Sequence, residues 1–304
     1  MPLRFTVLAS GSGGNASLLQ ADGLGVLIDA GLGPRQLAWR LRSVGLGWEQ
    51  VHLCLLTHTH GDHWRERTFA HLHRLGIPLY CHADHHPNLL AYGPSFTCLL
   101  ADRLVRSYHH NESLSLCPSL RCRPLALRHD SEATFGFRFE HVDGTSGCET
   151  ALAYLADLGC WSDNLLDSVR DVDLLALEFN HDVEMEYTSG RSPYLVRRVL
   201  GDQGHLSNEQ AADLLRHVLV RSEPDRLKHV VLLHLSRDCN RPELAQRAAR
   251  AALQECGSDA AFHTSCQHSA CSPVWFTGPV RRAPAQAAAW AETGSTPLLF
   301  PEMM

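Results

Sequence analysis

Thr57-His58-Thr59-His60-Gly61-Asp62-His63 is the densest polar cluster in the chain, and it directly follows the apolar run 51–56. The apolar run predicts a short buried strand, and side chains alternate between the two faces of a strand. If strand geometry persists briefly, His58 and His60 point to one face, while Asp62 and His63 belong to the following turn. Imidazole and carboxylate groups are ligands of Zn²⁺, Mn²⁺ and Fe²⁺. The stretch therefore predicts a metal site at a strand end.

Outside residues 57–63, the sequence alternates between strand and helix patterns. Helical spacing of apolar residues predicts helices at 34–44 and 65–75, after the cap Ser207, and at 244–253. Short apolar or alternating runs predict strands at 4–9, 16–20, 26–28, 78–81, 114–116, 121–128, 135–139, 151–155, 173–177 and 229–233. The polar clusters follow such strands, and in layered α/β proteins functional sites lie at the strand ends.

The composition is that of an ordinary globular protein. The chain has 304 residues, of which 44% are hydrophobic and 20% charged, and this excludes a disordered or fibrous chain. No apolar run approaches the ~18 residues that span a bilayer, and the stretch 5–9 is too short for a signal peptide. The eleven cysteines lack paired CxxC spacing, which favours reduced thiols and a cytoplasmic location. We expect a catalytic domain over 1–280 and a flexible tail over 281–304.

The pattern His-x-His-x-Asp-His is the signature of the metallo-β-lactamase superfamily, which the chain resembles over residues 3–280. The resemblance implies an α/β fold, a four-layer αββα sandwich, with two divalent metal ions bound between the sheets. It also implies one ligand after each of three later strands, and His129, Asp157 and His234 occupy those places. Zn²⁺ is the favoured metal and Mn²⁺ the alternative. One ion would be bound by His58, His60 and His129, and the other by Asp62, His63 and His234, with Asp157 between them.

Further motifs resemble the YycJ-like nuclease branch of this superfamily. In this branch two consecutive asparagines follow the last motif, whereas this chain has Cys239 and then Asn240. The short interval between Asp157 and His205 leaves no room for the large inserted domain of β-CASP nucleases. The motifs are Ser10-Gly11-Ser12-Gly13-Gly14-Asn15, Leu27-Ile28-Asp29-Ala30-Gly31, Glu178-Phe179-Asn180-His181-Asp182, Gly204-His205-Leu206-Ser207-Asn208 and His234-Leu235-Ser236.

The resemblance implies that the protein hydrolyses a phosphodiester with hydroxide that two metal ions activate. Asp62 would bind metal and orient the nucleophile. His205 would contact the scissile phosphate or protonate the leaving oxygen, and Glu178 would orient the imidazole. A role in the cap region beside Ser207 is the alternative for His205. The favoured substrate is DNA, shortened by an exonuclease in the 5′ to 3′ direction, so nucleic acid is the expected partner and a membrane is not.

Other interpretations stay open at this point. The net charge of −6 suits a phosphodiesterase for small cyclic or nucleotide substrates better than a nucleic-acid binder, and the same fold also hosts thioester and lactone hydrolases. Five arginines between residues 103 and 128 either follow a nucleic-acid backbone or form a solvated face. Residues 10–15 form a tight hairpin turn or a phosphate cradle, although they lack the Lys of a P-loop. The oligomeric state is also left open.

Overall fold

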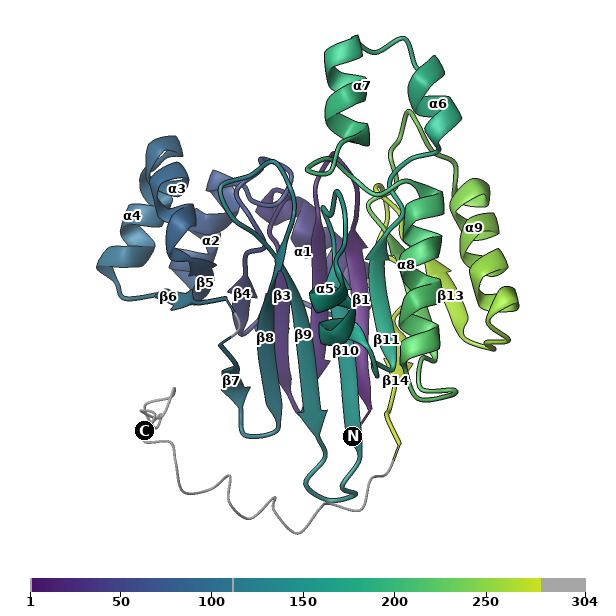
Figure 1. The fold of residues 1–304 in the computed structure, drawn as a ribbon. Coiled ribbons are helices and arrows are strands. Elements are labelled where there is room, and N and C mark those ends of the chain that lie inside the picture. Colours follow the sequence, from purple (N-terminus) through teal and green to yellow (C-terminus); the bar gives the residue numbers. More distant parts are fainter. Residues whose placement is uncertain (1, 111, 280–304) are drawn as a thin grey trace.

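Two seven-stranded sheets face each other, and helices cover the outer face of each sheet (Figure 1). The computed structural model describes residues 2–110 and 112–279. The first sheet has the strand order β14-β1-β2-β3-β4-β5-β6, and the second has the order β13-β12-β11-β10-β9-β8-β7. The predicted αββα sandwich is therefore confirmed.

The elements have the following bounds. The strands of the first sheet are β1 (Leu3–Ala9), β2 (Ala16–Ala21), β3 (Leu24–Ile28), β4 (Leu53–Leu55), β5 (Leu79–His82), β6 (Val105–Tyr108) and β14 (Val274–Phe276). The strands of the second sheet are β7 (Leu114–Cys117), β8 (Leu120–Leu127), β9 (Thr134–Val142), β10 (Glu149–Leu155), β11 (Leu174–Glu178), β12 (His229–Leu233) and β13 (Ala261–Thr264). The helices are α1 (Pro34–Ser43), α2 (Glu66–Leu75), α3 (His86–Tyr92), α4 (Pro94–Ala101), α5 (Asp163–Val169), α6 (Val183–Thr188), α7 (Pro193–Leu200), α8 (Asn208–Arg221) and α9 (Pro242–Glu255), with short 3₁₀ turns η1 (Trp48–Gln50) and η2 (Ala83–His85).

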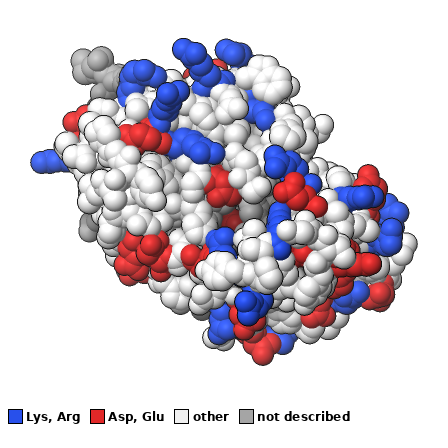
Figure 2. All heavy atoms as spheres, turned by 90° about the horizontal axis from the view of Figure 1, so that it is seen from above, with Lys and Arg blue, Asp and Glu red and all other residues white. Residues whose placement is uncertain are grey.

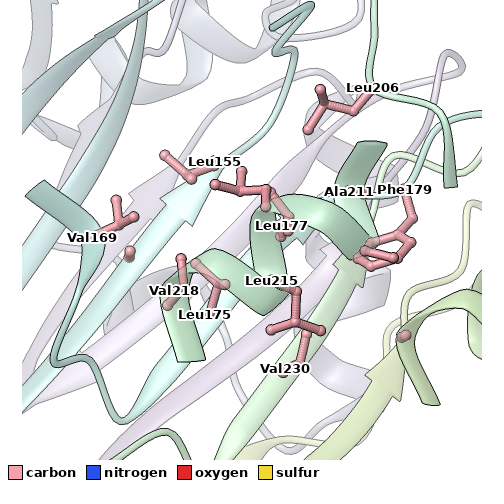
Figure 3. Close-up of a cluster of buried hydrophobic side chains, with 14 of the residues drawn as sticks. Leu155, Val169, Leu175, Leu177, Phe179, Leu206, Ala211, Leu215, Val218 and Val230 are labelled. Atoms are coloured by element: carbon pink, nitrogen blue, oxygen red, sulfur yellow. The ribbon is translucent and has the colours of Figure 1, made fainter. Parts of the chain in front are cut away.

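Three groups of buried apolar side chains hold the four layers together. The middle group lies between the sheets and includes Phe5, Phe137 and Tyr154. One outer group packs helices against the first sheet through residues such as Leu37 and Phe69. The other outer group packs α5 and α8 against the second sheet, and Figure 3 shows side chains of these helices and of β10, β11 and β12 gathered in it.

Strand β11 shows how its sequence produces this layering. All five of its residues are buried, so it is a continuous apolar run ending on a glutamate. Leu174 and Ala176 enter the group between the sheets, whereas Leu175 and Leu177 enter the group under the helices. Because successive side chains point to opposite faces, only a strand covered on both faces carries such a run.

The carboxyl ends of several strands meet at one edge of the sandwich. Strands β3, β4 and β5 are mutually parallel in the first sheet, and β10, β11 and β12 are parallel in the second. Strand β8 runs antiparallel to β9, which is antiparallel to β10, so β8 also ends at this edge. The residues that follow these strands are therefore brought together.

Three of the residues at this edge have left-handed backbone conformations. Asp29 follows β3, Asp157 follows β10 and His234 follows β12, with φ of 63°, 58° and 54°. A side chain held in this region costs on the order of 1–3 kcal/mol, although Asp and His tolerate it better than most residues. Four other non-glycine residues of the described chain, Asp22, Arg103, Asp171 and Asp225, share this conformation, so it does not by itself mark a site.

The sequence patterns do not predict α4, α5, α6 or α7. Each of these helices has eight residues or fewer, too few for a periodic apolar face to be recognised. The expected tail, 281–304, lies outside the described residues. Among the helices that the structure describes, no helix has the length and apolar character needed to cross a membrane.

Candidate metal centre

Three histidines from the two sheets converge after β4 and β8. Ligand atoms of His58, His60 and His129 lie within 4.8 Å of one another. The Nδ1 of His129 donates to the Gly204 carbonyl at 2.8 Å, which leaves its Nε2 3.2 Å from Nδ1 of His60. The Nε2 of His58 is buried and has no hydrogen-bond partner within the described chain. An unsatisfied buried nitrogen is costly unless something binds it, so this group is arranged to hold a cation.

A second group lies beside the first and contains Asp62, His63 and His234. Their ligand atoms also lie within 4.8 Å of one another. The Asp157 carboxylate lies between the groups, with Oδ2 2.9 Å from Nε2 of His63 and Oδ1 3.8 Å from Nε2 of His129. All seven predicted ligands thus lie together. Two further groups overlap these, His58 with His63 and Asp157, and Asp157 with Glu178, His205 and His234, so which residues share an ion stays a prediction.

Buried residues behind the ligands hold the imidazole of His63 in place. Oδ2 of Asp29 lies 2.7 Å from Nδ1 of His63, so Nδ1 donates and Nε2 is directed at the site. Oδ1 of Asp29 accepts from the backbone N–H of Thr57 at 2.8 Å. The side-chain nitrogen of Asn15 lies 3.0 Å from Nε2 of His63 and 3.3 Å from Oδ2 of Asp62. Such partners fix the tautomer and orientation of ligating histidines.

Glu178 and His205 form a pair at the edge of the ligand groups. Oε1 of Glu178 lies 2.7 Å from Nδ1 of His205 and 3.0 Å from Nδ1 of His234, and Oε2 accepts from the backbone N–H of Leu158 at 2.9 Å. The side chain of His205 is 18% exposed. The contact with Glu178 directs the His205 side chain into the site. The alternative role in the cap region is not needed, because the hydroxyl group of Ser207 caps α8 by itself.

Charges in the site shift several pKa values. Burial alone would raise the pKa of Glu178, but the imidazoles of His205 and His234 lower it to about 2. Burial alone would lower the pKa of His205, and the Glu178 carboxylate raises it above its ordinary value. His63 is also buried, yet the carboxylates around it, first Asp157, raise its pKa well above the ordinary value. Burial lowers the pKa of His58 well below its ordinary value, which keeps this imidazole neutral.

The donor set fits divalent metal ions. It combines five imidazoles with two carboxylates, and such ligands suit Zn²⁺, Mn²⁺ and Fe²⁺. The raised pKa values of His63 and His234 reflect an excess of negative charge among buried groups that a cation would neutralise. The residues present therefore fit a site for two divalent ions.

Several supporting residues carry no predicted role. Asp29 and Asn15 lie in motifs that resemble the nuclease branch. Their contacts with His63 form only in the folded chain, so the sequence does not indicate them. Asp130 is next to the ligand His129 in the sequence, and its Oδ1 lies 3.4 Å from Nε2 of His129. His181 is fully buried beside the site, so it cannot contact a substrate directly.

Residues 10–15 form the turn between β1 and β2, as the hairpin interpretation predicts. Their N–H groups are largely used within the protein, because Gly11 donates to the Asn15 side chain at 2.8 Å and Gly13 to the Gln267 side chain at 2.7 Å. The hydroxyl of Ser10 accepts from the N–H of His234 at 2.8 Å. The loop therefore supports the ligands from behind.

Asn240, which follows the departure at Cys239, joins neighbouring strand ends. Its side-chain nitrogen donates to the carbonyls of Phe179 and Asn180 at 2.8 and 2.9 Å, and its oxygen accepts from Asn208 at 2.9 Å. These bonds tie the loop after β12 to the loop after β11 and to the start of α8. The second asparagine alone thus supplies a structural link.

The fold and the ligand groups define a metal-dependent hydrolase. The family model of the beta-lactamase superfamily domain matches residues 25–235, and the chain belongs to this superfamily. It is 30% identical to Exodeoxyribonuclease YycJ of Bacillus anthracis over 264 residues, which cover 84% of this chain and 91% of that protein. It is 28% identical to Exodeoxyribonuclease WalJ of Streptococcus pneumoniae, with 80% of this chain and 85% of that protein covered.

A solved structure shares the fold at lower identity. The metallo-beta-lactamase fold protein YhfI from Bacillus subtilis superposes with a TM-score of 0.61 and 16% identity, covering 89% of this chain and 99% of YhfI. The similarity extends over nearly the whole of the described sandwich, so both sheets belong to the family fold.

Proposed function

We propose that this protein is a DNA exonuclease that shortens strands in the 5′ to 3′ direction. The observation that carries the proposal is the Glu178–His205 pair, which places a proton donor beside the two ligand groups. The substrate is proposed from two relatives named exodeoxyribonuclease that align over most of this chain.

In this proposal His58, His60, Asp62, His63, His129, Asp157 and His234 bind two divalent ions, with Zn²⁺ favoured and Mn²⁺ as the alternative. When bound, the ions would supply Lewis acidity that lowers the pKa of water and neutralises charge on a phosphodiester.

Side chains at the edge of the centre would orient the attacking water and donate the proton to the leaving oxygen. Asp62 is partly exposed, and its carboxylate orients the attacking water as well as binding metal. Nδ1 of His205 is taken by Glu178, so Nε2 is the atom that contacts the phosphate or gives a proton to the leaving oxygen. The Glu178 carboxylate raises the pKa of His205 above its ordinary value, which favours the protonated form that a proton donor needs.

A phosphodiesterase for small cyclic or nucleotide substrates is the second candidate. The net charge of −6 favours it, because a protein without overall positive charge gains less from binding a polyanion.

The test uses 5′- and 3′-labelled DNA, single and double stranded, incubated with the protein and Zn²⁺ or Mn²⁺. We expect the wild-type protein to shorten DNA progressively from the 5′ end, and the double variant His58→Ala, His60→Ala to lose both metal and activity. His205→Ala should keep its metal but lose about 10²–10⁴-fold in rate. Intact DNA together with cleavage of a small aryl phosphodiester would favour the second candidate.

A further inference from the structure

Helices α6 and α7 stand beyond the strand ends, on the side of the sandwich where the metal centre lies (Figure 1). They lie between β11 and α8 in the chain and contact each other. Helix α7 has an exposed outer surface with Tyr194, 75% of which is accessible to solvent, and with Arg197 and Arg198 in its last turn. The proposed catalytic steps use none of these residues.

A short series of contacts connects α7 to the metal centre. The Nε of Arg198 donates to Oδ2 of Asp130, and Oδ1 of Asp130 lies 3.4 Å from Nε2 of His129 and 3.7 Å from Nε2 of His60. One carboxylate therefore separates the Arg198 guanidinium from two proposed ligands. Tyr194 precedes Arg198 by four residues, so the two side chains are neighbours on one face of the helix.

Arg198 keeps binding capacity beyond its contact with Asp130. Its side chain is 43% exposed, and a guanidinium has five N–H donors, of which Asp130 engages the one on Nε. Within residues 2–110 and 112–279, no acceptor is recorded for its two Nη groups. These donors match the geometry of a phosphate group.

The ligand groups themselves are recessed. His58 and His63 are fully buried, and Asp157 nearly so. Figure 2 looks onto this side of the molecule and shows acidic atoms set back near its middle, with basic side chains around them. A strand that reaches the recessed ligands must pass the side chains around them.

We propose that α7 guides single-stranded DNA into the centre, with Arg198 binding a backbone phosphate next to the scissile one and Tyr194 stacking on an unpaired base. This inference rests on the proposed exonuclease function. Proteins that bind single strands combine cations along the backbone with aromatic side chains on which bases stack. Asp130 acts as a positioning residue, because it holds the guanidinium at the edge of the ligand groups until a phosphate arrives.

The test measures binding and cleavage separately. Anisotropy of a 3′-fluorescein-labelled, 5′-phosphorylated single strand gives Kd at several salt concentrations in EDTA, where no cleavage occurs. Shortening of the same strand with Mn²⁺ gives kcat and KM. The variants are Arg198→Ala, Tyr194→Ala and Tyr194→Phe. Arg197→Ala is the control, since it removes the same charge one residue away, from a side chain whose Nε bonds to the Pro193 carbonyl of its own helix.

We expect Tyr194→Ala to raise Kd by roughly 5- to 150-fold, the range for loss of one stacked base, and Tyr194→Phe to retain wild-type binding. Arg198→Ala should lower the slope of log Kd against log salt concentration by about 0.7, as for one lost phosphate contact. Both alanine variants should raise KM for the strand more than they change kcat. Arg197→Ala should bind and cleave like the wild type.

Different outcomes separate the two proposals. If Arg198→Ala and Tyr194→Ala behave like Arg197→Ala while the wild type shortens DNA, the role of α7 is wrong and the exonuclease function stands. If Tyr194→Ala weakens binding to a blunt duplex, which has no unpaired bases, as much as binding to the single strand, the stacking on Tyr194 is overturned. A wild-type protein that neither binds nor cuts DNA would overturn both. Because these side chains are exposed, unchanged circular dichroism should accompany every variant.

Discussion

Replacing Asp29 by alanine removes a buried carboxylate that touches no substrate and yet, in our interpretation, holds the metal centre together. Asp29 is fully buried and accepts from the backbone N–H of Thr57 at 2.8 Å and from Nδ1 of His63 at 2.7 Å. Each buried donor left without a partner costs about 1–3 kcal/mol. The Thr57 hydroxyl also donates to both Asp29 oxygens at 3.0 Å, but it lies 3.1 Å from Nδ1 of His63 and can accept from that nitrogen once Asp29 is gone. The backbone N–H of Thr57 is then the donor left without a partner, so the free energy of unfolding should fall by about 1–3 kcal/mol. The freed imidazole of His63 should also weaken metal binding by about 10- to 100-fold.

Both effects can be measured on purified protein. Urea unfolding with and without EDTA gives the stability, and competition with a chromogenic chelator gives the metal affinity. Asp22→Ala is the matched control, because Asp22 also lies 2.7 Å from a buried histidine, His141, but is partly exposed and lies in the β2–β3 turn. It should lose less stability and keep its metal affinity. If Asp29→Ala loses less than about 1 kcal/mol and binds metal like the wild type, the supporting role of Asp29 is refuted.

Two further predictions concern the same centre. A Cβ added at Gly31 would lie 1.8 Å from the carbonyl oxygen of Asp62, whereas one added at Gly61 would meet nothing within 4 Å. Gly31→Ala should therefore lower both thermal stability and metal content, measured by elemental analysis, while Gly61→Ala leaves both near wild type. His63 and His234 have raised pKa values, and each must lose a proton to bind metal, so metal affinity should increase with pH. Chelator competition between about pH 6 and pH 8 tests this in the range where histidine titrates, and equal affinity across the range would contradict it.

The layered fold is largely readable from strand periodicity and from one motif. Continuous apolar runs such as β11 and β12 require cover on both faces, which a sandwich with outer helices provides. Four of the seven proposed ligands stand in the motif 57–63, and the family resemblance implies the places of His129, Asp157 and His234 after three later strands. Their ligand roles remain predictions, although the structure brings them into two adjacent groups.

The parts that sequence reasoning missed depend on contacts between distant residues. Asp29 lies 34 positions from His63, and no local pattern indicates that they are paired. Helices α6 and α7 have only six and eight residues, too few to show a helical period, so the sequence patterns do not predict them. The five arginines between residues 103 and 128 are close together in the sequence, but the fold places some in or beside β6 in the first sheet and others in or beside β8 in the second.

The position of β14 has a consequence for how the chain is made. Strand β14 (Val274–Phe276) pairs with β1 (Leu3–Ala9), so β1 leaves the ribosome long before its outer neighbour does. At about 5–20 residues per second, β1 waits on the order of tens of seconds with one edge open. An open strand edge is a template for pairing with another chain. The newly made protein is therefore most exposed to aggregation during its own translation, and a slow or truncated synthesis would leave that edge uncovered.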